Sequence, residues 1–160
     1  MSDLRLALRQ ARFVNRAFWR NPASAFFTFA FPLIFLVIFT AVIGRGTVVI
    51  GGVRIEQERY YVAAMAAFSV ITACFTNVAM NVTHQRESGI LKRTRGTPLP
   101  PWAFLAGRVL HAMLVAVLLV VITGAFGIAL YGADVPGGTL LGEFVLTVVL
   151  GGLAFSALGL

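Results

Sequence analysis

The sequence predicts an all-α membrane protein in which an N-terminal interfacial amphipathic helix precedes about four transmembrane helices. Apolar residues make up 59% of the 160 residues and charged residues only 12%, about half of the charged share of a soluble domain. The apolar residues gather in four stretches, 23–43, 60–82, 102–130 and 141–160. Each stretch reaches the about 20 residues that a helix needs to cross a ~30 Å hydrocarbon core.

Charged residues avoid these stretches. Only Arg108 and Glu143 fall inside them, both near an end. A charge at the middle of a bilayer costs about 2.5–3.5 kcal/mol on insertion scales, so this avoidance supports membrane spans. The alternative is a soluble bundle of buried core helices, but four such helices leave too little polar sequence to cover them.

Residues 4–20 predict a basic amphipathic helix. At 100° per residue its arginines fall within an arc of about 80°, with apolar side chains on roughly the opposite side. The arginines are Arg5, Arg9, Arg12, Arg16 and Arg20. Such a helix suits the headgroup layer, where its arginines face lipid phosphates. The alternative is a basic tail that only sets orientation.

Two signals follow along the chain. Asn21-Pro22 is a favourable N-cap and first position for the next helix, so we expect the chain to bend there into the first span. Pro32 removes a backbone hydrogen bond inside that span and predicts a kink. The kink is as compatible with a mechanical role as with ordinary packing.

The basic residues of the connecting segments predict the orientation. The N-terminal segment and the segment 83–101 together hold nine basic residues, whereas 44–59 holds three and 131–140 none. Basic residues mark the cytoplasmic side. We therefore expect a multi-pass protein of the plasma (cytoplasmic) membrane with a cytoplasmic N-terminus. Because topology accounts for the positive charge, no nucleic acid is expected as a partner.

The sequence predicts no enzymatic activity for this chain. The sequence lacks the G-x-x-x-x-G-K-[ST] phosphate loop, so the chain is not expected to hydrolyse ATP itself. His84 and His111 have no companion metal ligands at useful spacing, and the single cysteine, Cys74, has no disulfide partner in the chain. We therefore expect no catalytic, cofactor-binding or metal-binding residues. Polar residues within the spans are expected to bridge helices more often than to bind substrate; they are Ser69, Thr72, Thr76, Asn77, Asn81 and Thr123.

The segment between the second and third apolar stretches is predicted to contain a short helix with a defined beginning and end. Gly89 is placed to end one helix, and residues 90–95 are expected to form a short amphipathic turn of helix. Gly96 and Thr97-Pro98 then break it, because a residue before proline avoids the helical region. A short amphipathic helix between the ends of two membrane spans is suited to contact a soluble partner. An ordinary basic loop that only fixes topology is the alternative.

The letters R-E-S-G-I-L-K-R-T-R-G-T-P-L in this segment resemble a family signature, that of ABC transporter permeases with the transmembrane type-2 domain. The family pattern is R-E-x-G-x-L-x-x-L-x-x-T-P-L, followed by a helix with a basic residue. The matching residues are Arg86, Glu87, Gly89, Leu91, Thr97, Pro98 and Leu99, with Arg108 as the following basic residue. Thr94 departs from the pattern, because the family usually has leucine there. The resemblance covers essentially the whole chain.

The resemblance implies a six-span permease that works with a separate ABC ATP-binding subunit, in which ATP and Mg are bound. Exporters of drugs, lipids or lipid-linked glycans are common in the family. The loop 86–97 would then dock on the ATPase, with these coupling residues: Arg86, Glu87, Gly89, Leu91, Arg93, Thr97 and Pro98. A second permease unit, in a homo- or heterodimer, and membrane lipids are the other partners implied.

The domain expected from the resemblance is a type-2 permease domain over residues 1–160, incomplete at its C-terminal end, because the chain stops in apolar sequence after about four spans. Two other functions remain open. One is a secondary carrier driven by an ion gradient, against which the lack of a mid-membrane acid counts. The other is a non-transporting membrane scaffold.

Overall fold

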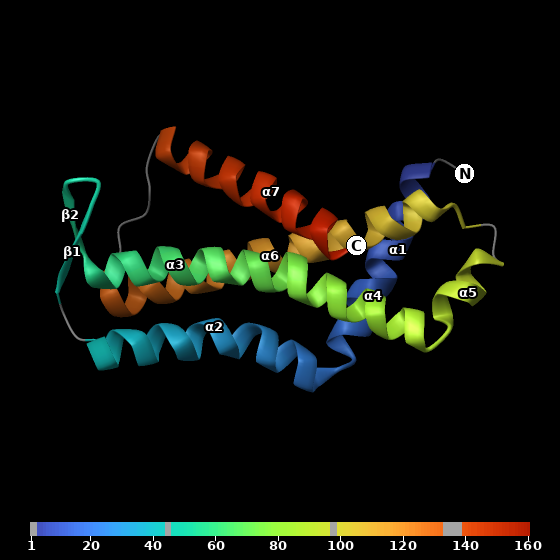
Figure 1. Cartoon of the computed structure of the whole chain (residues 1–160), viewed down its shortest axis with the longest axis horizontal. Coiled ribbons are helices and arrows are strands. Elements are labelled where there is room, and N and C mark those ends of the chain that lie inside the picture. Colours follow the sequence, from blue (N-terminus) through green and yellow to red (C-terminus); the bar gives the residue numbers. More distant parts are fainter. Residues whose placement is uncertain (1–2, 44–45, 97–98, 133–138) are drawn as a thin grey trace.

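The computed structural model describes residues 3–43, 46–96, 99–132 and 139–160 and is mainly helical (Figure 1). The elements, in chain order, are α1 (Asp3–Trp19), α2 (Pro22–Ile43), β1 (Thr47–Ile50), β2 (Val53–Glu56), α3 (Gln57–Ile71), the π-helical turn η1 (Thr72–Thr76), α4 (Asn77–Glu87), α5 (Ile90–Arg95), α6 (Pro101–Tyr131) and α7 (Thr139–Gly159). Four helices are long and apolar enough to cross a membrane: Pro22–Ile43, Gln57–Glu87, Pro101–Tyr131 and Thr139–Gly159. The predicted fold class, an N-terminal helix followed by four membrane helices, is confirmed.

The second of these helices is longer than the stretch 60–82 that the sequence singled out. α3, η1 and α4 run without interruption through 31 residues, which is about 46 Å at a rise of 1.5 Å per residue. This length exceeds the ~30 Å hydrocarbon core, so at least one end of the helix extends beyond the core. In Figure 1 the α4 end of this helix leads into α5, which projects from the bundle.

α1 crosses one end of the bundle instead of running along it (Figure 1). Its inward face contacts α6, and Ala7 and Phe18 are buried there. At the turn into α2 the Ser24 N–H donates to Asn21 Oδ1 at 3.2 Å, with Pro22 at the first helical position. The predicted Asn-Pro cap is therefore confirmed. α2 continues as a helix through Pro32, whose side chain is fully buried.

The core lies where α6 meets α1, α3 and α7, and small residues allow close approach there. Its largest fully buried apolar side chains include Leu119 and Val115 of α6, next to Ala73 and Cys74 of η1. The small residues Gly152 and Ser156, one turn apart on α7, are buried against this core. Small residues at helix contacts are what a membrane interior favours, because helices there associate through close packing.

The outer surface of the bundle is apolar. Phe27 of α2 is 65% exposed, and Leu146 and Leu158 of α7 are 58% and 72% exposed. Large apolar side chains over whole helices are unfavourable in water. The exposed side chains are those expected of a surface that faces lipid.

A two-stranded hairpin connects α2 to α3. β1 and β2 pair antiparallel, from Thr47 opposite Glu56 to Ile50 opposite Val53. Gly51 and Gly52 form the turn with φ values of +59° and +84°, and positive φ at both positions is the requirement of a type I′ turn. No strands were expected in this connecting segment from its sequence. The hairpin lies at the end of the bundle opposite α1 and α5 (Figure 1).

The polar residues within the spans differ from the expectation. The Ser69 and Thr72 hydroxyls donate to the carbonyl oxygens of Met65 and Phe68, four residues back on the same helix. The Asn81 amide likewise donates to the Asn77 carbonyl oxygen. The expectation that these three residues bridge helices is therefore wrong. A carbonyl one turn back is the nearest available acceptor where water is absent.

We predict that Gly107→Ala destabilises the protein by about 1–3 kcal/mol, the usual cost of overpacking. A methyl group on Gly107 would lie 2.7 Å from Gln10 Cβ and 3.0 Å from the Ala11 backbone nitrogen of α1. The free energy of unfolding is measured by denaturant titration in mixed micelles. Gly124→Ala is the matched control, because nothing lies within 4 Å of its added methyl group on the same helix. Equal effects of the two variants would contradict close packing of α1 on α6.

Candidate functional site

The chain reverses direction at the end of α4. The Ser88 N–H donates to the His84 carbonyl oxygen at 2.9 Å, and the Gly89 N–H donates to the Arg86 carbonyl oxygen at 3.3 Å. Gly89 has a φ of +72°, a conformation that glycine adopts at a helix end without a steric cost. The predicted helix end at Gly89 is confirmed, and residues 86–96 form what we call the α4–α5 corner.

α5 begins directly after this reversal and is short. The Arg93 N–H donates to the Gly89 carbonyl oxygen at 3.3 Å, and the Gly96 N–H donates to the Arg93 carbonyl oxygen at 3.1 Å. α5 packs mainly against α4. The short helix predicted for residues 90–95 and its end at Gly96 are therefore present in the structure.

The α4–α5 corner brings together five of the seven residues predicted to couple to an ATPase. Arg86 and Glu87 lie exposed in the last turn of α4, and Arg93 lies exposed on α5. Leu91 is half-buried, so the corner combines charges of both signs with an apolar side chain. Thr97 and Pro98, the remaining two, lie outside the described residues. This mixture of charge and apolar surface suits a protein–protein contact.

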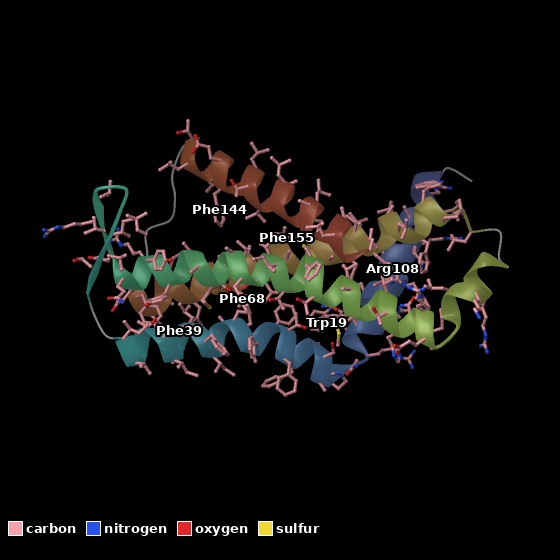
Figure 2. All side chains as sticks on the ribbon, in the orientation of Figure 1. Trp19, Phe39, Phe68, Arg108, Phe144 and Phe155 are labelled. Carbon is pink, nitrogen blue, oxygen red and sulfur yellow. The ribbon has the colours of Figure 1, made fainter. Side chains whose placement is uncertain are left out.

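Arg108 links α6 to α4 close to the corner. Its side chain is only 4% exposed, and one of its amino groups donates to Gln85 Oε1 of α4. Its guanidinium carbon also lies 4.3 Å from the centre of the Phe104 ring, a cation–π contact. Figure 2 shows Arg108 at the end of the bundle where α1, α4 and α6 come together. The family pattern predicted only a basic residue at this position. In the structure Arg108 connects α6 to α4.

His111 lies one turn further along α6 and is 8% exposed. Its ring centre lies 5.4 Å from that of Phe18 of α1. No metal-binding role was expected for His111, and its proximity to Arg108 was not predicted. Their spacing of three residues was the available signal, because residues three apart lie on the same face of a helix.

A cavity of about 580 Å³ lies where α1, α4 and α6 meet, and residues of α2 and η1 also line it. Phe13 and Phe18 of α1, Gln85 of α4, and Arg108 and His111 of α6 line it, together with Ile90 at the start of α5. The cavity therefore lies between the α4–α5 corner and the core of the bundle. Sequence analysis missed it, because its walls come from segments that no local pattern connects.

The five arginines on and just after α1, which we call the arginine stripe, do not line this cavity. Arg5, Arg9, Arg12, Arg16 and Arg20 are all exposed, as expected of a solvent- or headgroup-facing surface. Trp19 is 52% exposed and stacks on Phe29 of α2, with 5.6 Å between ring centres. Part of the apolar side of α1 is covered by α6. Contact of the five arginines with lipid stays a prediction.

Together, the four spans, the crossing helix α1 and the α4–α5 corner define a multi-pass membrane domain of a transport protein. The chain belongs to the ABC-2 type transporter family, whose pattern it matches over residues 7–160. It is thus a non-catalytic membrane domain, and ABC-2 permeases generally pair with ATP-binding subunits.

Two curated relatives are similar to part of the chain. They are the "Probable multidrug ABC transporter permease YbhR" of Escherichia coli strain K12 and that of Escherichia coli O157:H7. Each is 26% identical over 107 residues, which cover 67% of this chain and 28% of the relative. The match therefore spans little more than a quarter of the length of these relatives. No solved structure matches the chain.

We predict that the Gln85–Arg108 contact couples the stabilities of α4 and α6. Gln85→Leu removes the acceptor of a buried charged donor and is expected to lower the free energy of unfolding by about 1–3 kcal/mol. In a double-mutant cycle with Arg108→Met, the double variant should lose at least about 0.5 kcal/mol less than the sum of the two single losses. Unfolding in mixed micelles supplies the four free energies. Simple additivity would mean that the contact contributes nothing.

Proposed function

We propose that the chain is the transmembrane permease part of an ATP-driven exporter and that the α4–α5 corner docks on the separate ATP-binding subunit. The observation that carries this proposal is the corner itself. It consists of the last turn of α4, where Arg86 and Glu87 are exposed, and the short helix α5, where Arg93 is exposed. Gly89, with a positive φ, joins the two helices. Membership of the ABC-2 family supports the kind of partner.

We propose that the end carrying α1 and α5 faces the cytoplasm. Nine basic residues belong to the N-terminal segment and to 83–101, against three in 44–59. Positive residues favour the cytoplasmic side. The hairpin at the other end of the bundle would then face outward (Figure 1), and the plasma membrane is the membrane we propose.

The seven residues proposed to couple to the ATPase have different roles. Arg86, Glu87 and Arg93 supply exposed charges that complement charges on the ATPase, which favours one docking register. Leu91 enters an apolar depression of the partner. Gly89 allows the reversal of the chain, and we propose that Thr97 and Pro98 end the docking segment, because the residue before a proline is kept out of the helical region.

Force would pass from the corner into the spans in two ways. α4 continues through η1 into α3, so a displacement of α5 tilts the whole helix 57–87. The contact of Gln85 with Arg108 transmits the same displacement to α6. Such coupling requires that the ATPase bind two permease conformations with different free energies. A hundredfold difference in affinity corresponds to about 2.7 kcal/mol.

The transported substrate is proposed only as a class. Drugs, lipids and lipid-linked glycans share an apolar part that a pathway between apolar helices accepts, and the name of the relatives in Escherichia coli includes "multidrug". We propose a second permease unit, in a homo- or heterodimer, because α2 and α7 are covered only sparsely by the rest of the chain, with 17% and 11% of their apolar windows buried.

The two alternatives have less support. An ion-driven carrier needs an acid near the middle of the membrane, whereas Glu143 is the one acid that the described residues place in an apolar window, exposed near the beginning of α7. A membrane scaffold that transports nothing would account for the basic surface of α1, but it would not account for the projecting α4–α5 corner.

We predict that Leu91→Asp lowers permease-stimulated ATP hydrolysis by the partner at least tenfold, because a charge enters the apolar part of the contact. The measurement is ATP hydrolysis by the reconstituted pair, with membrane insertion checked separately. Val53→Asp in the hairpin is the control, since this apolar side chain is 62% exposed at the opposite end. Unchanged stimulation by Leu91→Asp would reject the docking proposal.

We also predict that the arginine stripe of α1 binds anionic lipid. Each basic residue near an anionic surface contributes about 1 kcal/mol, so replacing Arg9, Arg12 and Arg16 by glutamine should weaken binding of a peptide of residues 1–20 to anionic vesicles about a hundredfold. Lysine at the same three positions should largely preserve binding. If the wild-type peptide binds neutral and anionic vesicles equally, the electrostatic part of the proposal is wrong.

A further inference from the structure

The cavity between α1, α4 and α6 has a mixed lining. Its apolar lining, which we call the apolar wall, includes Phe13, Phe18 and Val115. Its polar lining, the polar wall, includes Gln85, Arg108 and His111. Its volume of about 580 Å³ lies within the range of about 300–1,000 Å³ that small-molecule sites occupy. A ligand that fits both walls has a polar end and an apolar end.

The polar wall favours an anion. Arg108 is 4% exposed and His111 is 8% exposed, and Arg108 Nε and His111 Nδ1 are buried without a hydrogen-bond partner within the described structure. The described residues that line the cavity include no aspartate or glutamate. A buried guanidinium is stabilised by a negative charge within hydrogen-bond reach, and Arg binds phosphate with paired, charge-assisted hydrogen bonds.

The apolar wall and the location of the cavity favour an amphiphile over a free ion. Phe18 is buried on the face of α1 opposite the exposed arginines. Ile90, at the start of α5, also lines the cavity. A head group held at Arg108 would therefore touch the polar wall while its chain lies along α1.

We propose that this cavity binds the phosphate head group of an anionic amphiphile. Arg108 holds the phosphate, His111 supplies a further hydrogen bond, and the Gln85 amide nitrogen donates to the phosphate while its oxygen stays on Arg108. The aromatic side chains of α1 contact the first part of the apolar chain. This site adjoins the α4–α5 corner at Ile90 but contains none of the seven residues proposed to couple to the ATPase, and the proposal does not depend on transport or on that partner. The amphiphile is either a membrane lipid or a smaller transported molecule.

Binding to the purified chain in phosphatidylcholine nanodiscs tests the proposal. The probes are fluorescent phosphatidic acid, a single-chain alkyl phosphate, glycerol 3-phosphate and inorganic phosphate. We expect the first two to bind at least tenfold more tightly than the last two. Tighter binding of phosphatidic acid would identify a membrane lipid as the source, and tighter binding of the alkyl phosphate a smaller amphiphile.

The variants separate this site from general electrostatic attraction. Arg108→Gln should weaken binding of phosphatidic acid at least tenfold, whereas Arg108→Lys should retain most of it. Arg54→Gln, which removes the same charge from the exposed hairpin at the opposite end of the bundle, should change affinity less than twofold. Equal losses for Arg108→Gln and Arg54→Gln, or equal affinity for inorganic phosphate and phosphatidic acid, would overturn the proposal.

A second measurement on the unmodified protein covers the case in which Arg108→Gln does not fold. A phosphatidic acid with a photoreactive group on its chain should label Phe13 or Phe18, and unlabelled phosphatidic acid, but not phosphatidylcholine, should compete. Labelling confined to exposed positions of α7, such as Leu146, would also overturn the proposal.

Discussion

A hydrocarbon core offers no hydrogen-bond partner to a peptide group, so every segment that crosses it must satisfy its own backbone. The rest of this structure follows from that constraint. The four apolar stretches are helices, and the hydroxyls of Ser69 and Thr72 bond to their own helix. In the part of the chain that the structure describes, the hairpin lies at one end of the bundle and the α4–α5 corner at the other (Figure 1). The part of the chain able to meet a soluble partner is therefore held by the ends of rigid helices.

The end that carries the corner is also where the chain places its buried polar groups. Arg108 joins α6 to α4 through Gln85, and His111 meets α1 at Phe18. Buried polar contacts specify one arrangement of helices more sharply than apolar packing does. If an ATPase displaces the α4–α5 corner, these contacts would transmit the displacement to α4, α6 and α1. An amphiphile bound in the adjacent cavity would touch the same helices and stabilise their arrangement.

Local signals in the sequence predicted local structure well. The Asn21-Pro22 cap, the helix end at Gly89 and the short helix after it each depend on a few neighbouring residues, and each is present. The hairpin was missed although Gly51-Gly52 between β-branched runs is a recognised turn signal. The cavity and the burial of Arg108 were not predictable in this way, because they depend on how α1, α4 and α6 pack across long separations in the sequence. The expected bridging by span hydroxyls failed for the opposite reason, since a nearer acceptor one turn back was available.

Cysteine cross-linking tests whether the α4–α5 corner contacts the ATP-binding subunit and moves with its nucleotide cycle. The cysteine is introduced by Lys92→Cys, at an exposed position of α5, in a Cys74→Ala background. We expect this cysteine to cross-link to the ATP-binding subunit, with a yield that changes between the nucleotide-free and ATP-bound states. Labelling of the same cysteine by an impermeant reagent from outside the cell, with no cross-link to the ATPase in any state, would contradict it.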